Sequence, residues 1–195
     1  KMANKVRMRE SLIMQAIYQG SGEFTCGIID AYDHSPLNPN LFMEGGDILI
    51  AREDVLLIGN GIRTSSQGID FLASRLSAIA PQGRRHIIVQ QLPHTPESFI
   101  HLDMVFTMLD RNKCMVFEPL ILGDNQYQTI HIVIDNGKIV KISSVANILS
   151  ALKGLGMDLE PVVCGGKADE WDQEREQWHS GANFFAFAPG KVISY

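Results

Sequence analysis

The amino-acid sequence predicts an α/β fold in which one strand–strand–helix–strand unit recurs about two and a half times. Three observations support this prediction. Short apolar runs occur in pairs around polar turns, which is typical of β-hairpins. A helical apolar stripe follows the pairs, and a single apolar run follows that stripe. Because one such unit leaves an apolar face uncovered, neighbouring units are expected to bury it against one another.

The N-terminal segment and the first unit follow these patterns. Apolar residues at helical spacing predict a helix over Val6–Tyr18, and Gly20-Ser21-Gly22 favours its end. Between residues 24 and 41 the polarity is mixed, and we expect one strand and a loop. The first unit is then predicted to consist of hairpin strands over Asp47–Ala51 and Asp54–Gly59, a helix over Ile69–Ile79 and a buried strand over His86–Gln90.

The second unit repeats this order and includes a second hairpin. The turn of that hairpin, Asn136-Gly137, is the strongest short hairpin signal in the chain. Two runs around Pro189-Gly190 then open a third unit. The predicted ranges are strands Leu102–Leu109 and Cys114–Phe117, hairpin strands Thr129–Asp135 and Lys138–Ile142, a helix over Val145–Leu155, a return strand over Leu159–Cys164, and the opening strands Asn183–Phe187 and Lys191–Tyr195.

Composition excludes several classes of protein. The 195 residues are 45% hydrophobic and 20% charged, which suits a folded core and argues against disorder. No apolar run approaches the roughly 18 residues of a membrane helix, so we expect no membrane partner. Seventeen Lys and Arg against 22 Asp and Glu give a net charge of −5, which argues against nucleic acid. Three separated cysteines form no disulfide framework and favour a reducing, cytoplasmic setting.

Two other kinds of site have weaker support from the same residues. Gly59-Asn60-Gly61 follows an apolar run as a dinucleotide loop does, but Thr64 stands where that fingerprint needs its third glycine. His101 and Asp103 lie two apart on a predicted strand, so both side chains would share one face and face one metal ion. No His or Cys pair has zinc spacing, however, and we expect no metal.

Charged side chains gather where predicted strands begin or end. Glu44 and Asp47 flank two glycines immediately before an apolar run, and Arg63 follows the next run. His101 and Asp103 stand at the start of a third. The Glu-Gly-Gly-Asp motif alone also fits an ordinary turn, because glycines let the backbone turn sharply. Its occurrence together with arginine, histidine and aspartate at other strand ends favours a polar site.

At these residues the sequence resembles the arginine deiminase family, within the pentein or guanidine-modifying superfamily. The motifs keep the family's order, and Glu44 and Arg63 keep the family's spacing. The resemblance covers nearly the whole chain, from Val6 to Tyr195. The motifs that carry it are Arg7–Leu12, Glu44–Asp47, Ile58–Thr64, His101–Phe106, Val163–Gly166, Arg175–Asn183 and Ala188–Gly190.

The resemblance implies both a fold and an activity. Residues 1–195 would be a single partial domain of a five-fold pseudosymmetric α/β propeller, the pentein fold, built from ββαβ units. The activity would be hydrolysis of L-arginine to L-citrulline and ammonia through a covalent cysteine intermediate, with no metal and no organic cofactor. A final strand that stops at Tyr195 also leads us to expect a fragment of a longer protein.

The resemblance also assigns roles to individual residues. His101 matches the general acid/base of the family, and Glu44 matches the carboxylate that orients it. Asp103 matches a carboxylate that grips the guanidinium. The basic groups that hold the substrate carboxylate are matched by Arg63 and by either Arg7 or Arg9.

The chemistry requires a set of this kind. A guanidinium is a planar, delocalised cation whose donors suit carboxylates in a bidentate geometry. Its central carbon is a poor electrophile, so a thiolate that adds to it divides the hydrolysis into two easier steps. An imidazole must then protonate the departing ammonia and deprotonate water. A nearby glutamate favours the charged imidazolium and fixes its orientation.

Two family residues have no match in this sequence. One is an aspartate, in an Arg-Asp motif upstream of the first helix, that also grips the guanidinium. The other is the nucleophilic cysteine, in a loop downstream of the last strand. Cys26, Cys114 and Cys164 do not match its position, and packing is expected for all three. We therefore expect this chain alone to be inactive.

Two other functions remain open. Another guanidine-modifying reaction, amidino transfer or dimethylarginine hydrolysis, would differ in its leaving group and acceptor. The Arg175-Glu-Gln-Trp178 segment favours the deiminase branch. A non-catalytic arginine-binding pentein module, without a nucleophile, is the second alternative. The expected partner is the small molecule L-arginine, with assembly into a homo-oligomer left open.

Overall fold

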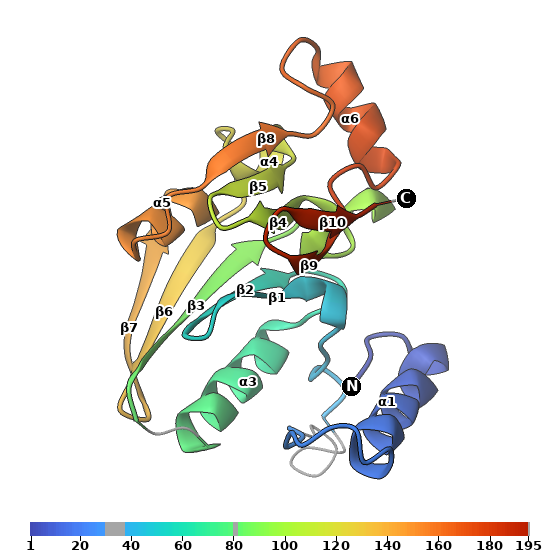
Figure 1. The fold of residues 1–195 in the computed structure, drawn as a ribbon, viewed down its shortest axis with the longest axis vertical. Coiled ribbons are helices and arrows are strands. Elements are labelled where there is room, and N and C mark those ends of the chain that lie inside the picture. Colours follow the sequence, from blue (N-terminus) through green and yellow to red (C-terminus); the bar gives the residue numbers. More distant parts are fainter. Residues whose placement is uncertain (30–37, 80–81, 195) are drawn as a thin grey trace.

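The computed structural model describes residues 1–29, 38–79 and 82–194, and Figure 1 shows their arrangement. In chain order the 3₁₀ turns (η), helices (α) and strands (β) are η1 Lys5–Arg7, α1 Met8–Gly20, η2 Gly45–Asp47, β1 Ile48–Arg52, β2 Val55–Asn60, α3 Ser66–Ile79, β3 Arg84–Gln91, η3 Glu97–Phe99, η4 Leu102–Met104, β4 Phe106–Asp110, β5 Lys113–Val116, α4 Glu118–Ile121, β6 Thr129–Asp135, β7 Lys138–Val145, α5 Ile148–Gly154, β8 Glu160–Val163, α6 Glu170–Trp178, β9 Phe185–Ala188 and β10 Lys191–Ile193.

Two complete units share one strand pattern. In the first, β1 pairs antiparallel with β2, and β2 pairs parallel with β3 after the crossover through α3. In the second, β4 pairs antiparallel with β5, and β5 pairs parallel with β8 after α5. A parallel pair needs such a crossover, because a tight turn reverses the chain. The α/β class and the strand–strand–helix–strand order predicted from the sequence are confirmed, and β9 and β10 form a further antiparallel hairpin.

The prediction that places the hairpin β6–β7 in the second unit is wrong. Strand β6 pairs antiparallel with β3, with Asp135 opposite Arg84, and extends the first sheet to the order β1-β2-β3-β6-β7. The physical reason is burial, because Ile132 and Ile134 of β6 pack with Ile87 of β3 in one apolar cluster. An apolar strand pattern shows that a face must be covered, but it does not show which sheet covers it.

The turn of this hairpin confirms its prediction. Asn136 and Gly137 have φ angles of 47° and 75°, so both lie in the left-handed region. A two-residue type I′ turn requires that conformation at both positions, and asparagine and glycine adopt it most readily.

The N-terminal helix is confirmed as α1, after the short turn η1. Its apolar residues are nevertheless exposed, with Leu12 at 57% and Ile13 at 56%. The strand expected between residues 24 and 41 does not occur at 24–29 or 38–41, and the rest of that prediction lies outside the described residues. None of the described helices combines the length and the apolar character that crossing a bilayer requires.

Buried apolar side chains cover both faces of the five-stranded sheet. Residues that alternate along β2 point to opposite faces, so Ile58 packs toward α3 while Leu57 packs toward the second unit. The cluster that contains Leu57 also includes three residues that come shortly after His101, and their burial anchors the segment that carries His101. These residues are Leu102, Val105 and Phe106, all fully buried.

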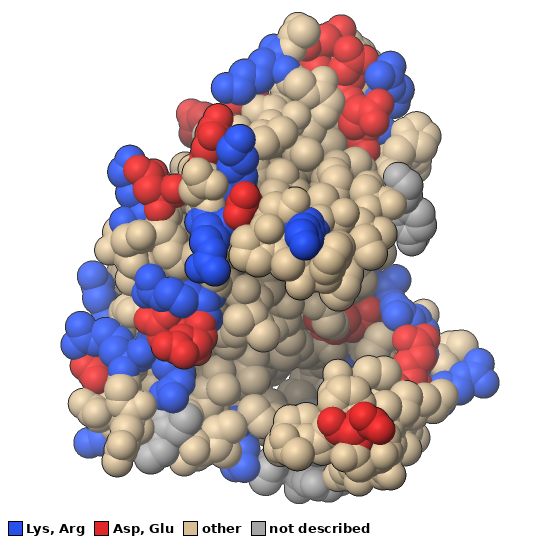
Figure 2. Space-filling view, viewed as in Figure 1, with Lys and Arg blue, Asp and Glu red and all other residues tan. Residues whose placement is uncertain are grey.

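The described strands form three sheets, of five, three and two strands. Figure 1 shows the hairpin β9–β10 beside β4 of the second unit, and the two elements are in contact. These sheets do not close into a ring within the described residues, so the five-fold propeller stays a prediction. Figure 2 shows basic and acidic groups interspersed over one face of the molecule rather than a continuous basic stripe.

Candidate active site

Four segments bring charged side chains together beside the start of β1. Glu44 directly precedes η2, and Arg63 lies in the turn that follows β2. His101 directly precedes η4, and Arg7 ends η1. The glycines after Glu44 let the chain turn into β1, while the buried residues after His101 hold the second segment against the core. The structure thus joins four residues that the sequence places far apart.

The carboxylate of Glu44 is the centre of this cluster. Glu44 is only 3% exposed. Its Oε2 lies 3.0 Å from Nη1 of Arg7 and 3.1 Å from Nε2 of His101. Its Oε1 accepts a hydrogen bond from the Ala3 N–H at 3.1 Å and lies 3.6 Å from Nη1 of Arg63. A buried carboxylate is stable only with partners of this kind, so Glu44 holds two arginines and the imidazole of His101 at one point.

Contact with Glu44 orients His101. Because a carboxylate only accepts hydrogen bonds, Nε2 of His101 carries the hydrogen in this pair. The other ring nitrogen, Nδ1, is then the atom that takes up a proton when the imidazole becomes charged. An imidazole whose orientation is fixed by a carboxylate is the arrangement expected of an acid/base histidine.

The sequence pattern predicts that His101 and Asp103 share one face of a strand. The structure contradicts this prediction, because neither residue lies in a strand. The strand expected from Leu102 begins only at β4, and the preceding residues form the 3₁₀ turn η4. The reason is that Leu102 and Val105 are both fully buried. A spacing of three matches the three residues per turn of a 3₁₀ helix rather than the alternation of a strand. The argument for one metal ion on a common strand face therefore loses its basis.

Asp103 carries a buried carboxylate oxygen, Oδ1, that lacks a hydrogen-bond partner among the described residues. Burial raises the pKa of Asp103, while the charge of His101 and a hydrogen bond from Asn183 oppose that rise. Asp103, Thr107 and Asn183 line a cavity of about 470 Å³. A cationic hydrogen-bond donor in this cavity would satisfy the buried oxygen.

Gly46 allows the imidazole and the Asp103 carboxylate to meet at the backbone. A Cβ atom on Gly46 would lie 2.8 Å from Cγ and Nδ1 of His101 and 3.0 Å from Oδ2 of Asp103. Distances this short are repulsive, so only glycine fits at this position. The acid/base candidate and the guanidinium-binding candidate therefore flank one residue.

Comparison with known proteins decides the family. All of the chain, residues 1–195, matches the sequence model of the arginine deiminase family. The chain belongs to this family. It is 31% identical over 199 residues to the arginine deiminases of Staphylococcus aureus strains JH9 and Newman. These alignments cover 100% of this chain and 47% of each relative, so the chain spans about half the length of the curated relatives it matches.

Asp47 is a residue of the family motif to which the sequence analysis assigns no role. It is fully buried, and burial raises its pKa to about 6 against the opposing effect of a hydrogen bond from Thr64. Its Oδ1 accepts the Leu102 N–H at 2.9 Å. The predicted hairpin contained a signal for a role of Asp47. Because Ile48 pairs with Ile58, Asp47 lies beside Gly59, and the missing side chain of this glycine leaves room for the Asp47 carboxylate.

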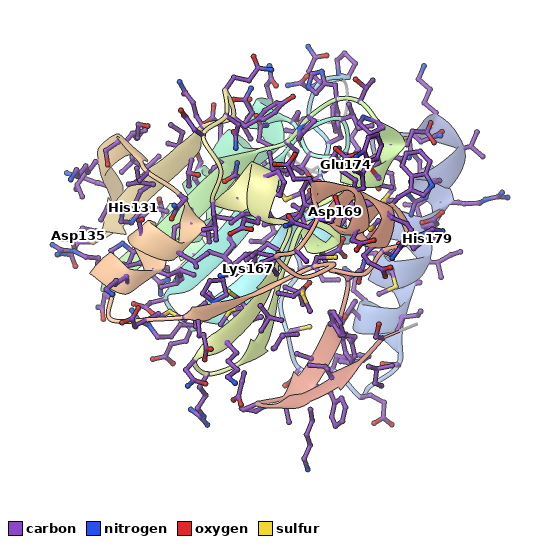
Figure 3. All side chains as sticks on the ribbon, turned by 90° about the horizontal axis from the view of Figure 1, so that it is seen from above. His131, Asp135, Lys167, Asp169, Glu174 and His179 are labelled. Carbon is purple, nitrogen blue, oxygen red and sulfur yellow. The ribbon has the colours of Figure 1, made fainter. Side chains whose placement is uncertain are left out.

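His101 is the one described histidine that contacts Glu44. Figure 3 places His131 on β6 and His179 at the end of α6, on opposite sides of the view. His131 instead lies with its Nε2 2.9 Å from Nδ1 of His86 on the neighbouring strand. The hydrogen bonds of His86, His131 and His179 are to one another or to a nearby backbone carbonyl, so within the described part of this arginine deiminase family member only His101 pairs its imidazole with the buried Glu44.

The cysteines of the chain should differ strongly in reactivity. Burial raises the pKa of Cys114 to about 12 and that of Cys164 to about 11, whereas Cys26 is exposed. Since the thiolate is the reactive species, iodoacetamide near pH ~8 should modify Cys26 at least about tenfold faster than the other two. Peptide mass spectrometry over time measures the three rates. All three should react together in urea, and fast labelling of Cys164 in the folded protein would contradict its burial.

Proposed function

We propose that this chain carries the acid/base and substrate-binding part of an arginine deiminase, which hydrolyses L-arginine to L-citrulline and ammonia. The observation that carries the proposal is the 3.1 Å contact of His101 with buried Glu44, near Asp103, whose buried Oδ1 lacks a hydrogen-bond partner among the described residues. An imidazole oriented by one carboxylate and flanked by a second suits a cationic substrate that must lose ammonia. Family membership and the names of the Staphylococcus aureus relatives support arginine as the substrate.

In this proposal the two ends of arginine bind to different groups. Asp103 accepts hydrogen bonds from the guanidinium, which gives its buried, unpartnered Oδ1 a donor. Arg63 and Arg7 hold the substrate carboxylate. Both arginines contact Glu44 in the structure, and the 3.6 Å separation of Arg63 is longer than the 3.0 Å of Arg7. Arg63 is therefore the arginine that turns more readily from Glu44 to a substrate carboxylate.

The proposed reaction has two steps. A cysteine thiolate, supplied by a cysteine other than the three in this chain, adds to the guanidinium carbon. Charged His101 gives its proton to one terminal nitrogen, the C–N bond breaks, and ammonia leaves behind a covalent thiouronium. Neutral His101 then takes a proton from water as the water oxygen adds to the same carbon. The C–S bond breaks, the thiolate leaves with its electron pair, and the product oxygen loses its remaining proton to solvent to give citrulline.

The proposal extends to the whole enzyme. The two ββαβ units and the hairpin β9–β10 support a five-fold propeller of which this chain is one part. Three free cysteines, Cys26, Cys114 and Cys164, support a reducing compartment, and we assign the enzyme to the cytoplasm. Since none of these cysteines matches the family nucleophile, the 195-residue chain alone is expected to be inactive.

A product assay tests the proposed function. The complete enzyme, in which this chain is joined by the part that supplies the nucleophilic cysteine, should form citrulline and ammonia from L-arginine in equal amounts, measured by colorimetry and by mass spectrometry. All kinetic predictions below refer to this complete enzyme. Amidino transfer to added glycine would instead give ornithine and guanidinoacetate without ammonia. Conversion of dimethylarginine, but not arginine, to citrulline and dimethylamine would identify the other hydrolase. Binding of arginine by calorimetry without any product would identify the non-catalytic module, and each of these three outcomes would overturn the deiminase proposal.

A further inference from the structure

Asp47 is an unusual residue for the interior of this protein. It is fully buried at the end of η2, where β1 begins. Within the described residues it forms no ion pair with a lysine or an arginine. Burying a carboxylate without a cationic partner is unfavourable unless hydrogen bonds compensate. The contacts of Asp47 therefore show what this carboxylate does.

One contact of Asp47 fixes the turn that carries the site. Its Oδ1 accepts the backbone N–H of Leu102 at 2.9 Å. Leu102 is the residue between His101 and Asp103, and its own side chain is fully buried in the core. The backbone of this turn is thus held by Asp47 on one side and by core packing on the other. A shift of the backbone of His101 or Asp103 relative to Asp47 would therefore disturb this hydrogen bond.

A second contact connects Asp47 to the segment of Glu44. The hydroxyl of Thr64 lies beside the Asp47 carboxylate, where it opposes the rise in the pKa of Asp47 that burial causes, and Oδ2 of Asp47 has no other partner among the described residues. The same hydroxyl oxygen accepts the backbone N–H of Glu44 at 3.2 Å. Thr64 is fully buried, so water does not replace this link. Asp47 therefore joins the backbone of the orienting carboxylate to the backbone of the turn that carries the imidazole.

The neighbouring strand leaves space for this carboxylate. A Cβ atom at Gly59 would overlap Oδ1 of Asp47 and would lie 2.9 Å from Cδ1 of Leu92. Glycine in the interior of β2 weakens the strand relative to alanine, because glycine loses more backbone freedom on folding. The fold accepts that loss at the one position that would otherwise exclude the side chain of Asp47.

We propose that Asp47 is a positioning residue of the deiminase site, which sets the distance between the Glu44 segment and the turn of His101 and Asp103. The inference rests on the proposed function, because its consequence is an effect on arginine hydrolysis. A displacement of about 1 Å in a catalytic geometry lowers rates by roughly 100-fold. A displacement of that size would break the 2.9 Å hydrogen bond from Leu102 to Asp47 and the 3.2 Å hydrogen bond from Glu44 to Thr64.

Two substitutions at position 47 distinguish the effect on kcat of the hydrogen bond that Asp47 accepts from the effect of its charge. Asp47→Ala removes the acceptor and should lower kcat by about 100-fold. Asp47→Asn keeps an oxygen for the Leu102 N–H and should remain within about fivefold of the parent kcat, since the geometry is preserved. Ile134→Val, a cavity variant in the distant part of β6, controls for lost stability and should leave kcat unchanged.

Thr64→Val tests the second link and keeps the shape of the side chain. It removes the hydroxyl between Asp47 and Glu44, and kcat should fall by about tenfold, less than for loss of the direct contact. This variant decides the question if Asp47→Ala does not fold. Parent-like kcat in Thr64→Val, or a loss in Asp47→Ala no larger than that of an equally destabilised Ile134 variant, would overturn the positioning role.

A second readout does not depend on activity. Hydrogen exchange of the Leu102 amide, followed by nuclear magnetic resonance, should be slow in the parent and in Asp47→Asn and at least about tenfold faster in Asp47→Ala. An unchanged exchange rate in Asp47→Ala would refute the contact. If the parent protein does not hydrolyse arginine but the exchange rates behave as expected, the proposed function fails while the structural link between Asp47 and the turn stands.

Discussion

Replacing His101 with alanine should lower kcat for arginine hydrolysis by about 1,000-fold, because proton transfer by a positioned side chain contributes roughly 10²–10⁴-fold. The fold should be kept, since the His101 side chain is partly exposed and contacts Glu44 rather than the apolar core. Citrulline formation at saturating arginine measures kcat. Circular dichroism during heating checks that the variant is folded at the assay temperature.

His94→Ala is the matched control for this variant. His94 is an exposed histidine in the loop after β3, and its loss should leave kcat within about twofold, as for most surface substitutions. A parent-like rate in His101→Ala would remove His101 from the mechanism. Equal losses in both histidine variants would show that the effect is not specific to the imidazole beside Glu44.

Gly46→Ala should reduce kcat/KM by at least about 100-fold, although it adds only one methyl group. The new Cβ would lie 2.8 Å from the ring of His101 and 3.0 Å from the Asp103 carboxylate. Both side chains must move away from their positions, which separates the imidazole from Glu44 and shifts the oxygen that grips the guanidinium. Because two functions are disturbed together, both kcat and KM should change, and steady-state kinetics with arginine measures both.

Gly45→Ala provides a closely matched comparison. A Cβ at this adjacent glycine would meet no described atom within 4 Å, and neither glycine has a positive φ angle. The two variants therefore share the same chemical change and the same loss of backbone freedom, but only one is crowded. Kinetic losses of similar size in both would show that backbone flexibility of the motif, rather than the space beside His101 and Asp103, is what matters.

Features that depend on neighbouring residues could be predicted from the sequence. The Asn136-Gly137 turn was identified correctly because positive φ angles are a property of the residues themselves. The helix α3 was predicted from a local apolar stripe. The strand expected from Leu102 was wrong at its start. Leu102 and Val105 are both buried, and their spacing of three positions fits the 3₁₀ turn that the structure shows rather than the alternation of a strand.

The same limit applies to the candidate site. The motifs around Glu44 and His101 could be recognised as parts of one site because their residue types and order match a known family. Their contacts could not be derived. The sequence offered Arg7 and Arg9 equally, and the structure brings Arg7 to Glu44. It named Asp47 without a role, although this carboxylate holds the turn between His101 and Asp103.

By itself, the sequence determined the α/β class and the strand–strand–helix–strand order, and it named the charged residues of the candidate site. Only the tertiary structure decided that β6–β7 extends the first sheet, and that one buried carboxylate serves Arg7, Arg63 and His101. The physical reason is distance along the chain. Glu44 meets partners 37 and 57 positions away, and such meetings depend on how sheets and turns pack, which a local residue pattern does not encode.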